Sequence, residues 1–199
     1  MANIHPIFDK IVNKTRKEQL LKQKAIVIWF VGLSGSGKST IAVALENELH
    51  KRGFLTQLLD GDNLRTGVNN NLGFSAIDRT ENIRRTSEVA KLFLNCGVIT
   101  LCSFISPTEE IRSAAKSIIG VENFFEVYVK CSLEVAEQRD VKGLYAKARK
   151  GEIKEFTGIT SPFEEPQTPD LLVDTGTETA QDSVAKVFDA IIKKIKTEE

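Results

Sequence analysis

Hydrophobic and polar positions alternate along the chain in two distinct patterns. Strands buried on both faces are predicted by continuous apolar runs at 25–31, 54–59, 98–104, 124–129 and 171–173. Apolar residues at helical spacing, with a capping box at 75–78, predict helices over about 38–52, 75–95, 108–119 and 178–195. Because strands and helices alternate, we expect a three-layer α/β fold with a mainly parallel five-stranded sheet and helices on both faces.

Two segments lie outside this alternation. Residues 8–24 carry six Lys and Arg against two acids, and we expect a solvated helix there within a polar leader that spans 1–24. A partner-binding arm is the alternative. Residues 139–168 combine charge, glycine and proline without a strong core-facing period, which is typical of a functional lid or a mobile loop. The chain from 25 to 199 is then a single domain that includes this lid.

The strongest chemical signal is a glycine-rich segment between the first predicted strand and helix. Residues 32–40 read GLSGSGKST and match the P-loop pattern GxxxxGK[ST]. Such a loop turns backbone N–H groups toward a triphosphate, and the start of the helix adds its positive end. We expect Lys38 to reach the outer phosphates and the Ser39 hydroxyl to ligate Mg²⁺. The predicted ATP site comprises Gly32, Leu33, Ser34, Gly35, Ser36, Gly37, Lys38, Ser39 and Thr40.

A P-loop identifies a nucleoside triphosphate but not what is done with it. A GTPase switch is disfavoured, because an NKxD motif is absent and the only DxxG, at 140–143, lies in the predicted lid. An ATP-driven module of a larger machine would carry oligomerisation segments, and the sequence gives no sign of them. A small-molecule kinase remains, with its acceptor bound at the carboxyl edge of the sheet.

Charged side chains follow the second predicted strand at that same edge. Asp60, Asp62 and Arg65 lie there, where the acids suit Mg²⁺ held through water and the orientation of an acceptor hydroxyl. A solvated Asp/Gly turn is the alternative for these residues. Arg79 and Asn82 share one face in the first turn of the next helix, so they are further candidates for the acceptor site.

Four segments together resemble the adenylylsulfate kinases, also called APS kinases. They are Leu59–Arg85 (LDGDNLRTGVNNNLGFSAIDRTENIRR), 103–107 (SFISP), 142–145 (KGLY) and 151–159 (GEIKEFTGI). The resemblance extends from about residue 25 to the C-terminus. It implies the P-loop kinase fold, a homodimer, and a role in sulfate activation. The implied reaction is transfer of the γ-phosphoryl group of ATP to the ribose 3′-hydroxyl of adenosine 5′-phosphosulfate.

The same resemblance assigns roles at the acceptor site. Asp62 would orient the 3′-hydroxyl or accept its proton, and Phe74 and Phe156 would enclose the adenine between their rings. Taken alone, each phenylalanine is as typical of a hydrophobic core. Contacts with the phosphosulfate and ribose are implied for Arg65, Arg79 and Asn82, further acceptor contacts for Ile105, Ser106, Lys142 and Leu144, and an ATP contact for Arg139.

Ser106 has two possible roles. One interpretation of this motif in the family makes the serine a phosphorylated intermediate. The sequence offers no obvious activating base for it, because His5 lies in the leader and His50 near the end of the first predicted core helix. Kinases of this fold generally transfer the phosphoryl group directly, so we favour a binding role for Ser106.

The sequence departs from the family pattern just after this motif. Residues 108–112 read TEEIR and keep only Arg112 of the usual series, which weakens any role for this helix start in ligand or partner contact. Two alternatives to the APS kinase assignment stay open. One is a related P-loop kinase for a nucleoside monophosphate or a small sugar acid. The other is a regulator without transfer activity, which intact Lys38, Ser39 and Asp62 disfavour.

The charge balance limits the classes of partner. The 199 residues include 27 Lys and Arg and 27 Asp and Glu, so the formal net charge is zero. This disfavours the broad basic surface of a dedicated nucleic-acid or membrane-surface binder, so neither partner is expected. Net neutrality is compatible with a basic cleft for two anionic nucleotides, which we expect from Lys38, Arg65, Arg79, Arg139 and Lys142.

Targeting features and cysteines bear on the compartment. The longest apolar run, 25–33, is about half of the ~20 residues that a membrane span needs, and no secretory signal is visible. We therefore expect a cytoplasmic protein. Cys96, Cys102 and Cys131 lack CxxC spacing, and we expect them to be small buried side chains without metal or redox duty.

Overall fold

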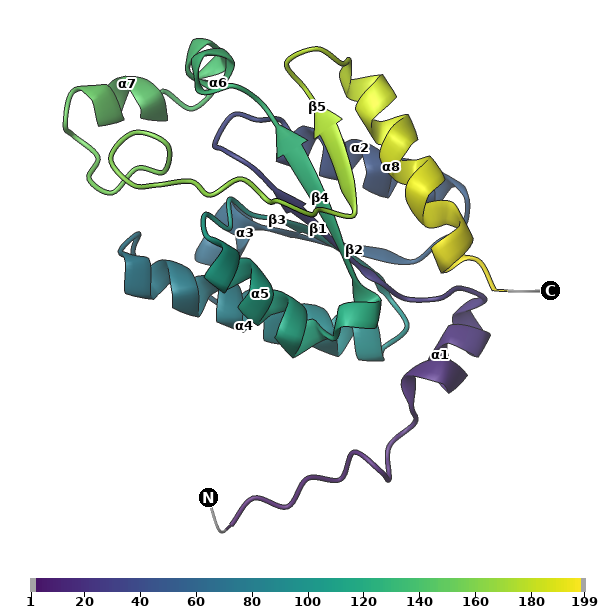
Figure 1. Cartoon of the computed structure of the whole chain (residues 1–199). Helices are drawn as coiled ribbons and strands as arrows, with labels where there is room; N and C mark the ends of the chain where they lie inside the picture. The colour runs from purple at the N-terminus through teal and green to yellow at the C-terminus, as the bar shows by residue number, and fades with distance from the viewer. Residues whose placement is uncertain (1–2, 198–199) are drawn as a thin grey trace.

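A five-stranded parallel sheet forms the centre of the molecule (Figure 1). The computed structural model describes residues 3–197. The strands lie in the order β2-β3-β1-β4-β5, and every neighbouring pair is parallel. Their bounds are β1 Val27–Val31, β2 Thr56–Asp60, β3 Ile99–Ser103, β4 Phe124–Lys130 and β5 Leu171–Asp174. The predicted fold class is confirmed.

Helices cover both faces of the sheet. On one face α2 packs against α8, and on the other α4 packs against α5. The helices are α1 Lys14–Leu21, α2 Lys38–Lys51, α3 Gly61–Arg65, α4 Ala76–Asn95, α5 Glu109–Ile119, α6 Leu133–Arg139, α7 Leu144–Arg149 and α8 Ala180–Ile195, with a short 3₁₀ turn at Val121–Asn123. The four predicted helices of the core correspond to α2, α4, α5 and α8.

The central strand β1 explains why its sequence is continuously apolar. Ile28 and Phe30 enter the core beneath α2 and α8, whereas Val27, Trp29 and Val31 enter the core beneath α4 and α5. Each of these side chains is fully buried. A strand with a hydrophobic core on each side has no solvent face, so polar residues are excluded from both of its alternating positions.

Two helix starts show how the capping signals operate. Ser75 caps α4 by accepting from the N–H of Asp78, but its own hydroxyl bonds the Asp78 carboxylate. The full capping box forms instead at Thr179 and Asp182 of α8, where each side chain accepts from the other residue's N–H. The predicted start of α4 is confirmed, but the carboxylate partner of its capping box is engaged differently.

The leader differs from the expected solvated helix over 8–24. Its helix α1 is limited to Lys14–Leu21, while the chain before it extends away from the body (Figure 1). The leader also anchors to the core, because Glu18 accepts from the N–H of Ala25 at 2.7 Å. Gln23 is buried, and its amide donates to the carbonyls of Leu55 and Gly97 at the start of two strands.

The segment predicted as an irregular lid contains helix α7 and a small core of its own. Tyr145, Ala148 and Phe156 pack there against Cys131 and Ala136, which lie in and just before the short helix α6. Neither α6 nor α7 has an apolar stripe long enough to give a helical period, because α6 buries one residue and α7 buries two. The lid is therefore a packed element over the edge of the sheet.

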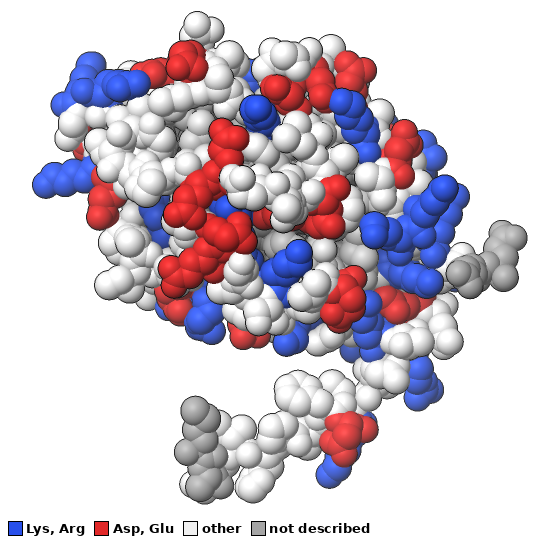
Figure 2. Space-filling model, viewed as in Figure 1, with Lys and Arg blue, Asp and Glu red and all other residues white. Residues whose placement is uncertain are grey.

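The surface carries both signs of charge. On the face shown in Figure 2, acidic and basic side chains are interspersed, as the zero net charge suggests. Cys102 and Cys131 are buried, but Cys96 is exposed at the end of α4, so the expectation of three buried cysteines is wrong for that residue. Among residues 3–197, none of the helices combines the length and the apolar character that a membrane crossing requires.

Candidate active site

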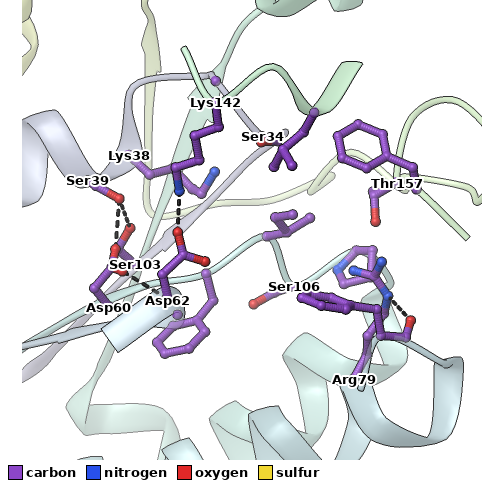
Figure 3. Close-up of a pocket in the computed structure, with 18 of the residues that line it drawn as sticks. Ser34, Lys38, Ser39, Asp60, Asp62, Arg79, Ser103, Ser106, Lys142 and Thr157 are labelled. Carbon is purple, nitrogen blue, oxygen red and sulfur yellow. Dashed lines mark hydrogen bonds and ion pairs between the residues drawn. The ribbon is translucent and has the colours of Figure 1, made fainter. Parts of the chain in front are cut away.

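A cavity of about 650 Å³ opens at the carboxyl edge of the sheet (Figure 3). It lies between the P-loop, α3, the start of α4, the segment after β3 and the lid. Most residues predicted for the two substrates line it: Ser34, Gly35, Gly37, Lys38, Ser39, Thr40, Asp60, Asp62, Arg65, Phe74, Arg79, Asn82, Ile105, Ser106, Lys142, Leu144 and Phe156. Four predicted residues do not line it, namely Gly32, Leu33, Ser36 and Arg139.

Glycines allow the P-loop to pack tightly beneath the cavity. A Cβ atom on Gly32 would lie 2.5 Å from the carbonyl oxygen of Val129, so a side chain cannot fit there. Gly37 adopts a positive φ of 96° as the N-cap of α2, a conformation that favours glycine. These constraints explain the role of Gly32, which shapes the loop from below without reaching the cavity.

Lys38 lies buried at the start of α2. Its ammonium donates to the carbonyl oxygen of Leu33 at 2.6 Å. Burial, and after it the nearby charge of Lys142, together lower the pKa of Lys38 to about 7, against the opposing effect of the Asp60 and Asp62 carboxylates. An anionic ligand beside this lysine would favour its charged form.

Hydroxyl and carboxylate oxygens meet beside the P-loop. The Ser39 hydroxyl lies 2.8 Å from an Asp60 carboxylate oxygen and 3.1 Å from the Ser103 hydroxyl. Asp60 also caps α3 by accepting from the N–H of Asp62. Magnesium prefers oxygen ligands and keeps several waters when few protein groups are offered, so this donor set fits that ion. Residues 3–197 hold no cluster of three or more His, Cys, Asp or Glu side chains suited to a metal.

Asp62 lies at the start of the short helix α3, which the sequence did not predict. In Figure 3 its carboxylate points toward the lid, where Lys142 forms an ion pair with it. The helix has only five residues and buries none of them, so it has no apolar period to read from sequence. Asp62 and Lys142, 80 positions apart, are brought together by the fold.

Two arginines brace the loop before α4. Arg65 stacks 4.3 Å from the centre of the Phe74 ring and donates to the carbonyls of Leu72 and Gly73. Arg79 donates to the carbonyl of Phe74 at 2.8 Å and to that of Glu155 in the lid at 2.7 Å. Burial lowers the pKa of both guanidiniums, which nevertheless stay charged at neutral pH.

The two predicted aromatic residues lie on the cavity wall in different environments. Phe74 is 57% exposed, whereas Phe156 is buried and meets Tyr145 edge to face at 4.9 Å. Asn82 is buried and accepts from the side-chain amide of Asn69. The wall therefore offers an exposed ring that stacks against Arg65 on one element, and a ring held by the lid core on another.

Ser106 lies in a constrained, buried position. It adopts a positive φ of 45°, and its hydroxyl accepts from the indole N–H of Trp29 at 3.0 Å. Its carbonyl accepts from the guanidinium of Arg112, which is buried and also bonds the carbonyl of Glu164. The helix start at 108–112 thus has a structural role that its departure from the family pattern did not suggest: Arg112 holds the Ser106 loop.

Three further residues connect the site and were missed from sequence. The Tyr145 hydroxyl donates to the carbonyl of Ser34, which ties the lid to the P-loop. Thr175, after β5, donates to the carbonyl of Ser36 and accepts from Arg139, so it links Arg139 to the P-loop. Thr157 lines the cavity next to Phe156. Tyr145 and Thr157 lie in segments that carry the family resemblance, but neither they nor Thr175 carry a sequence signal for these particular contacts.

The fold and this site define a P-loop kinase. The sequence model of the adenylylsulphate kinase family matches residues 24–174. Adenylyl-sulfate kinases of Bacteroides fragilis and Bacteroides thetaiotaomicron are 56% and 58% identical over 197 and 194 residues, covering 99% and 98% of this chain and 98% and 96% of theirs. The chain belongs to the adenylylsulphate kinase family, as its sequence motifs suggested.

A solved relative is similar throughout the fold. The APS kinase of Mycobacterium tuberculosis, determined in complex with AMPPNP and APS, superposes with a TM-score of 0.82 at 45% identity. The match covers 85% of this chain and 98% of that one.

Proposed function

We propose that this protein transfers the γ-phosphoryl group of ATP to the ribose 3′-hydroxyl of adenosine 5′-phosphosulfate, giving 3′-phosphoadenylyl sulfate and ADP. The observation that carries the proposal is a single cavity in which Lys38 of the P-loop and Asp62 face the same space. The Mycobacterium tuberculosis relative was determined with an ATP analogue and APS together, which supports the same pair of substrates here. The product would serve sulfate activation.

The P-loop side would hold ATP. Backbone N–H groups of the P-loop residues that line the cavity and the ammonium of Lys38 bind the phosphates, whose charge restores the protonated form of that lysine. Ser39 and, through water, Asp60 would hold Mg²⁺, which supplies charge neutralisation on the phosphates when bound. Arg139 would contribute to the ATP side through Thr175, because it donates to that residue beside the P-loop.

The opposite side would hold the phosphosulfate nucleotide. Asp62 orients the 3′-hydroxyl and accepts its proton, while Lys142 supplies a cation where charge moves toward the leaving ADP. Arg65 and Arg79 neutralise the phosphosulfate. The adenine lies between the rings of Phe74 and Phe156. Asn82 contacts the sugar, and Ile105 and Leu144 form apolar walls.

Ser106 is proposed to bind substrate without forming a covalent intermediate. Its hydroxyl oxygen already accepts from the Trp29 indole, and no histidine lies among the residues that line the cavity. A hydroxyl held in this way can still donate its proton to an anionic ligand. Direct in-line transfer needs positioning and charge neutralisation, and the remaining residues supply both.

Two further properties belong to the proposal. We infer a homodimer from the family resemblance; light scattering of the purified protein tests it, and a monomer would contradict it. We also infer that the protein works in the cytoplasm, where the exposed thiol of Cys96 and the buried thiols of Cys102 and Cys131 stay reduced.

The reaction is tested by identifying the product. The enzyme is incubated with ATP, Mg²⁺ and adenosine 5′-phosphosulfate, and the position of the new phosphate is read by ³¹P NMR. We expect a phosphomonoester on the ribose 3′-oxygen together with stoichiometric ADP. Lys38→Ala serves as the inactive control. A phosphate elsewhere, or ATP hydrolysis without transfer, would refute the proposal.

A further inference from the structure

One buried hydroxyl on the cavity wall has no hydrogen-bond partner. Thr157 is only 2% exposed, yet its Oγ1 atom contacts no donor or acceptor among residues 3–197. Burying a hydroxyl without a hydrogen-bond partner destabilises the folded protein, so such groups are rare unless a ligand or water completes them. In Figure 3 this hydroxyl points from the lid toward the side of the cavity where Arg79 and Ser106 lie.

The turn that carries Thr157 is fixed by its neighbours. The carbonyl of Phe156 accepts from the N–H groups of Thr160 and Ser161, and the Thr160 hydroxyl accepts from the N–H of Phe156. Just before the turn, Glu155 adopts a positive φ of 54°, and its carbonyl accepts from Arg79 of α4. The hydroxyl of Thr160 is thus used within the turn, whereas that of Thr157 is left for the cavity.

We propose that Thr157 is a specificity-determining residue that accepts a hydrogen bond from the exocyclic amino group of the acceptor's purine base. This inference rests on the proposed function. Under that function the reacting ribose lies toward Asp62 and the base lies against Phe156, so the edge of the base far from the ribose faces the next residue along the lid. Adenine carries its amino group on that edge. The Thr157 oxygen has free lone pairs for it.

A double-mutant cycle between residue and ligand tests the contact. The acceptors are adenosine 5′-phosphosulfate and the analogue in which a hydrogen replaces the 6-amino group of the base. The enzymes are the wild type, Thr157→Val, which removes the hydroxyl at equal volume, and Thr157→Ser, which keeps it. A neutral hydrogen bond is worth about threefold to tenfold in kcat/KM.

The wild type should prefer the amino-bearing acceptor by about threefold to tenfold in kcat/KM. Thr157→Val should lose this preference, whereas Thr157→Ser should keep it. The KM for ATP should stay within about twofold in each variant, because the P-loop is unchanged. The midpoint of thermal unfolding of free Thr157→Val should equal or exceed that of the wild type, since an unpaired buried hydroxyl is removed.

Thr160→Val is the matched control in the same turn. Its loss of the bond to the Phe156 N–H should lower kcat/KM for both acceptors equally and leave their ratio unchanged. The inference is overturned if Thr157→Val keeps the wild-type ratio, or if the wild type shows no preference. A wild type that phosphorylates neither acceptor would instead refute the proposed function.

Discussion

Lys142 in the lid forms an ion pair with Asp62 at the start of α3, and both residues line the cavity (Figure 3). Both side chains are more than half exposed, so the pair contributes little to the free energy of unfolding. The ion pair instead fixes where the two side chains lie. It holds a lid cation beside the carboxylate that is proposed to orient the acceptor hydroxyl, at the place where ATP and acceptor would meet.

Removing the Lys142 charge should therefore affect catalysis and spare stability. Lys142→Met is expected to lower kcat/KM for the acceptor by about 10²–10³-fold, the scale of a lost charge-stabilising group. Lys142→Arg should keep most of the activity, and the free energy of unfolding of either variant should change by less than about 1 kcal/mol. Steady-state kinetics and urea unfolding measure the two effects. Wild-type kinetics in Lys142→Met would contradict the assigned role.

Asp62→Asn should slow turnover more than it weakens acceptor binding. The amide keeps the shape of the side chain but cannot accept the hydroxyl proton, and general-base groups contribute about 10²–10⁴-fold. We expect that loss in kcat, with KM for the acceptor changed by only a few-fold. An effect confined to KM would show that Asp62 merely binds the acceptor.

The buried lysine makes stability depend on pH. Burial lowers the pKa of Lys38 to about 7 from the ordinary 10.5, so between these values the unfolded chain binds more protons than the folded one. The free energy of unfolding therefore rises with pH over this window, by up to about 1.4 kcal/mol per pH unit. Lys38→Met should lose this increment and all transfer activity. Denaturant titrations at pH 7.5 and 9.0 compare the two proteins, and parallel pH profiles would exclude the effect.

Ser106→Ala should weaken the enzyme without inactivating it. The substitution leaves the buried indole N–H of Trp29 unpaired, which costs about 1–3 kcal/mol of stability. Transfer should persist at a measurable rate, because no step is proposed to pass through a phosphoserine. Complete loss of turnover with normal binding of both substrates would restore the covalent interpretation.

Features with a local pattern were predictable from sequence. The P-loop and the continuously apolar strand β1 are each encoded by consecutive residues. They can be recognised from sequence because the backbone geometry at each position depends on its near neighbours. The segment around Asp62 was placed correctly at the sheet edge because it follows a strand, although the helix there was not predicted.

Contacts between distant segments were not predictable. The Tyr145 hydroxyl and the Ser34 carbonyl are 111 positions apart, and Thr175 and Ser36 are 139 apart. Neither pair has a spacing or composition that marks it. The burial of Gln23 was not predicted for the same reason. A glutamine in a polar leader is expected to be solvated, and the carbonyls that it bonds belong to segments distant in the sequence.

The central claim is the identity of the acceptor. ADP release is measured at saturating ATP and Mg²⁺ with a panel of acceptors: adenosine 5′-phosphosulfate, AMP, CMP, gluconate and shikimate. We predict rapid turnover with adenosine 5′-phosphosulfate and rates near background with the other four, because only that nucleotide offers both a base for the aromatic wall and a phosphosulfate for the arginines. Faster turnover with AMP, CMP, gluconate or shikimate would contradict the account.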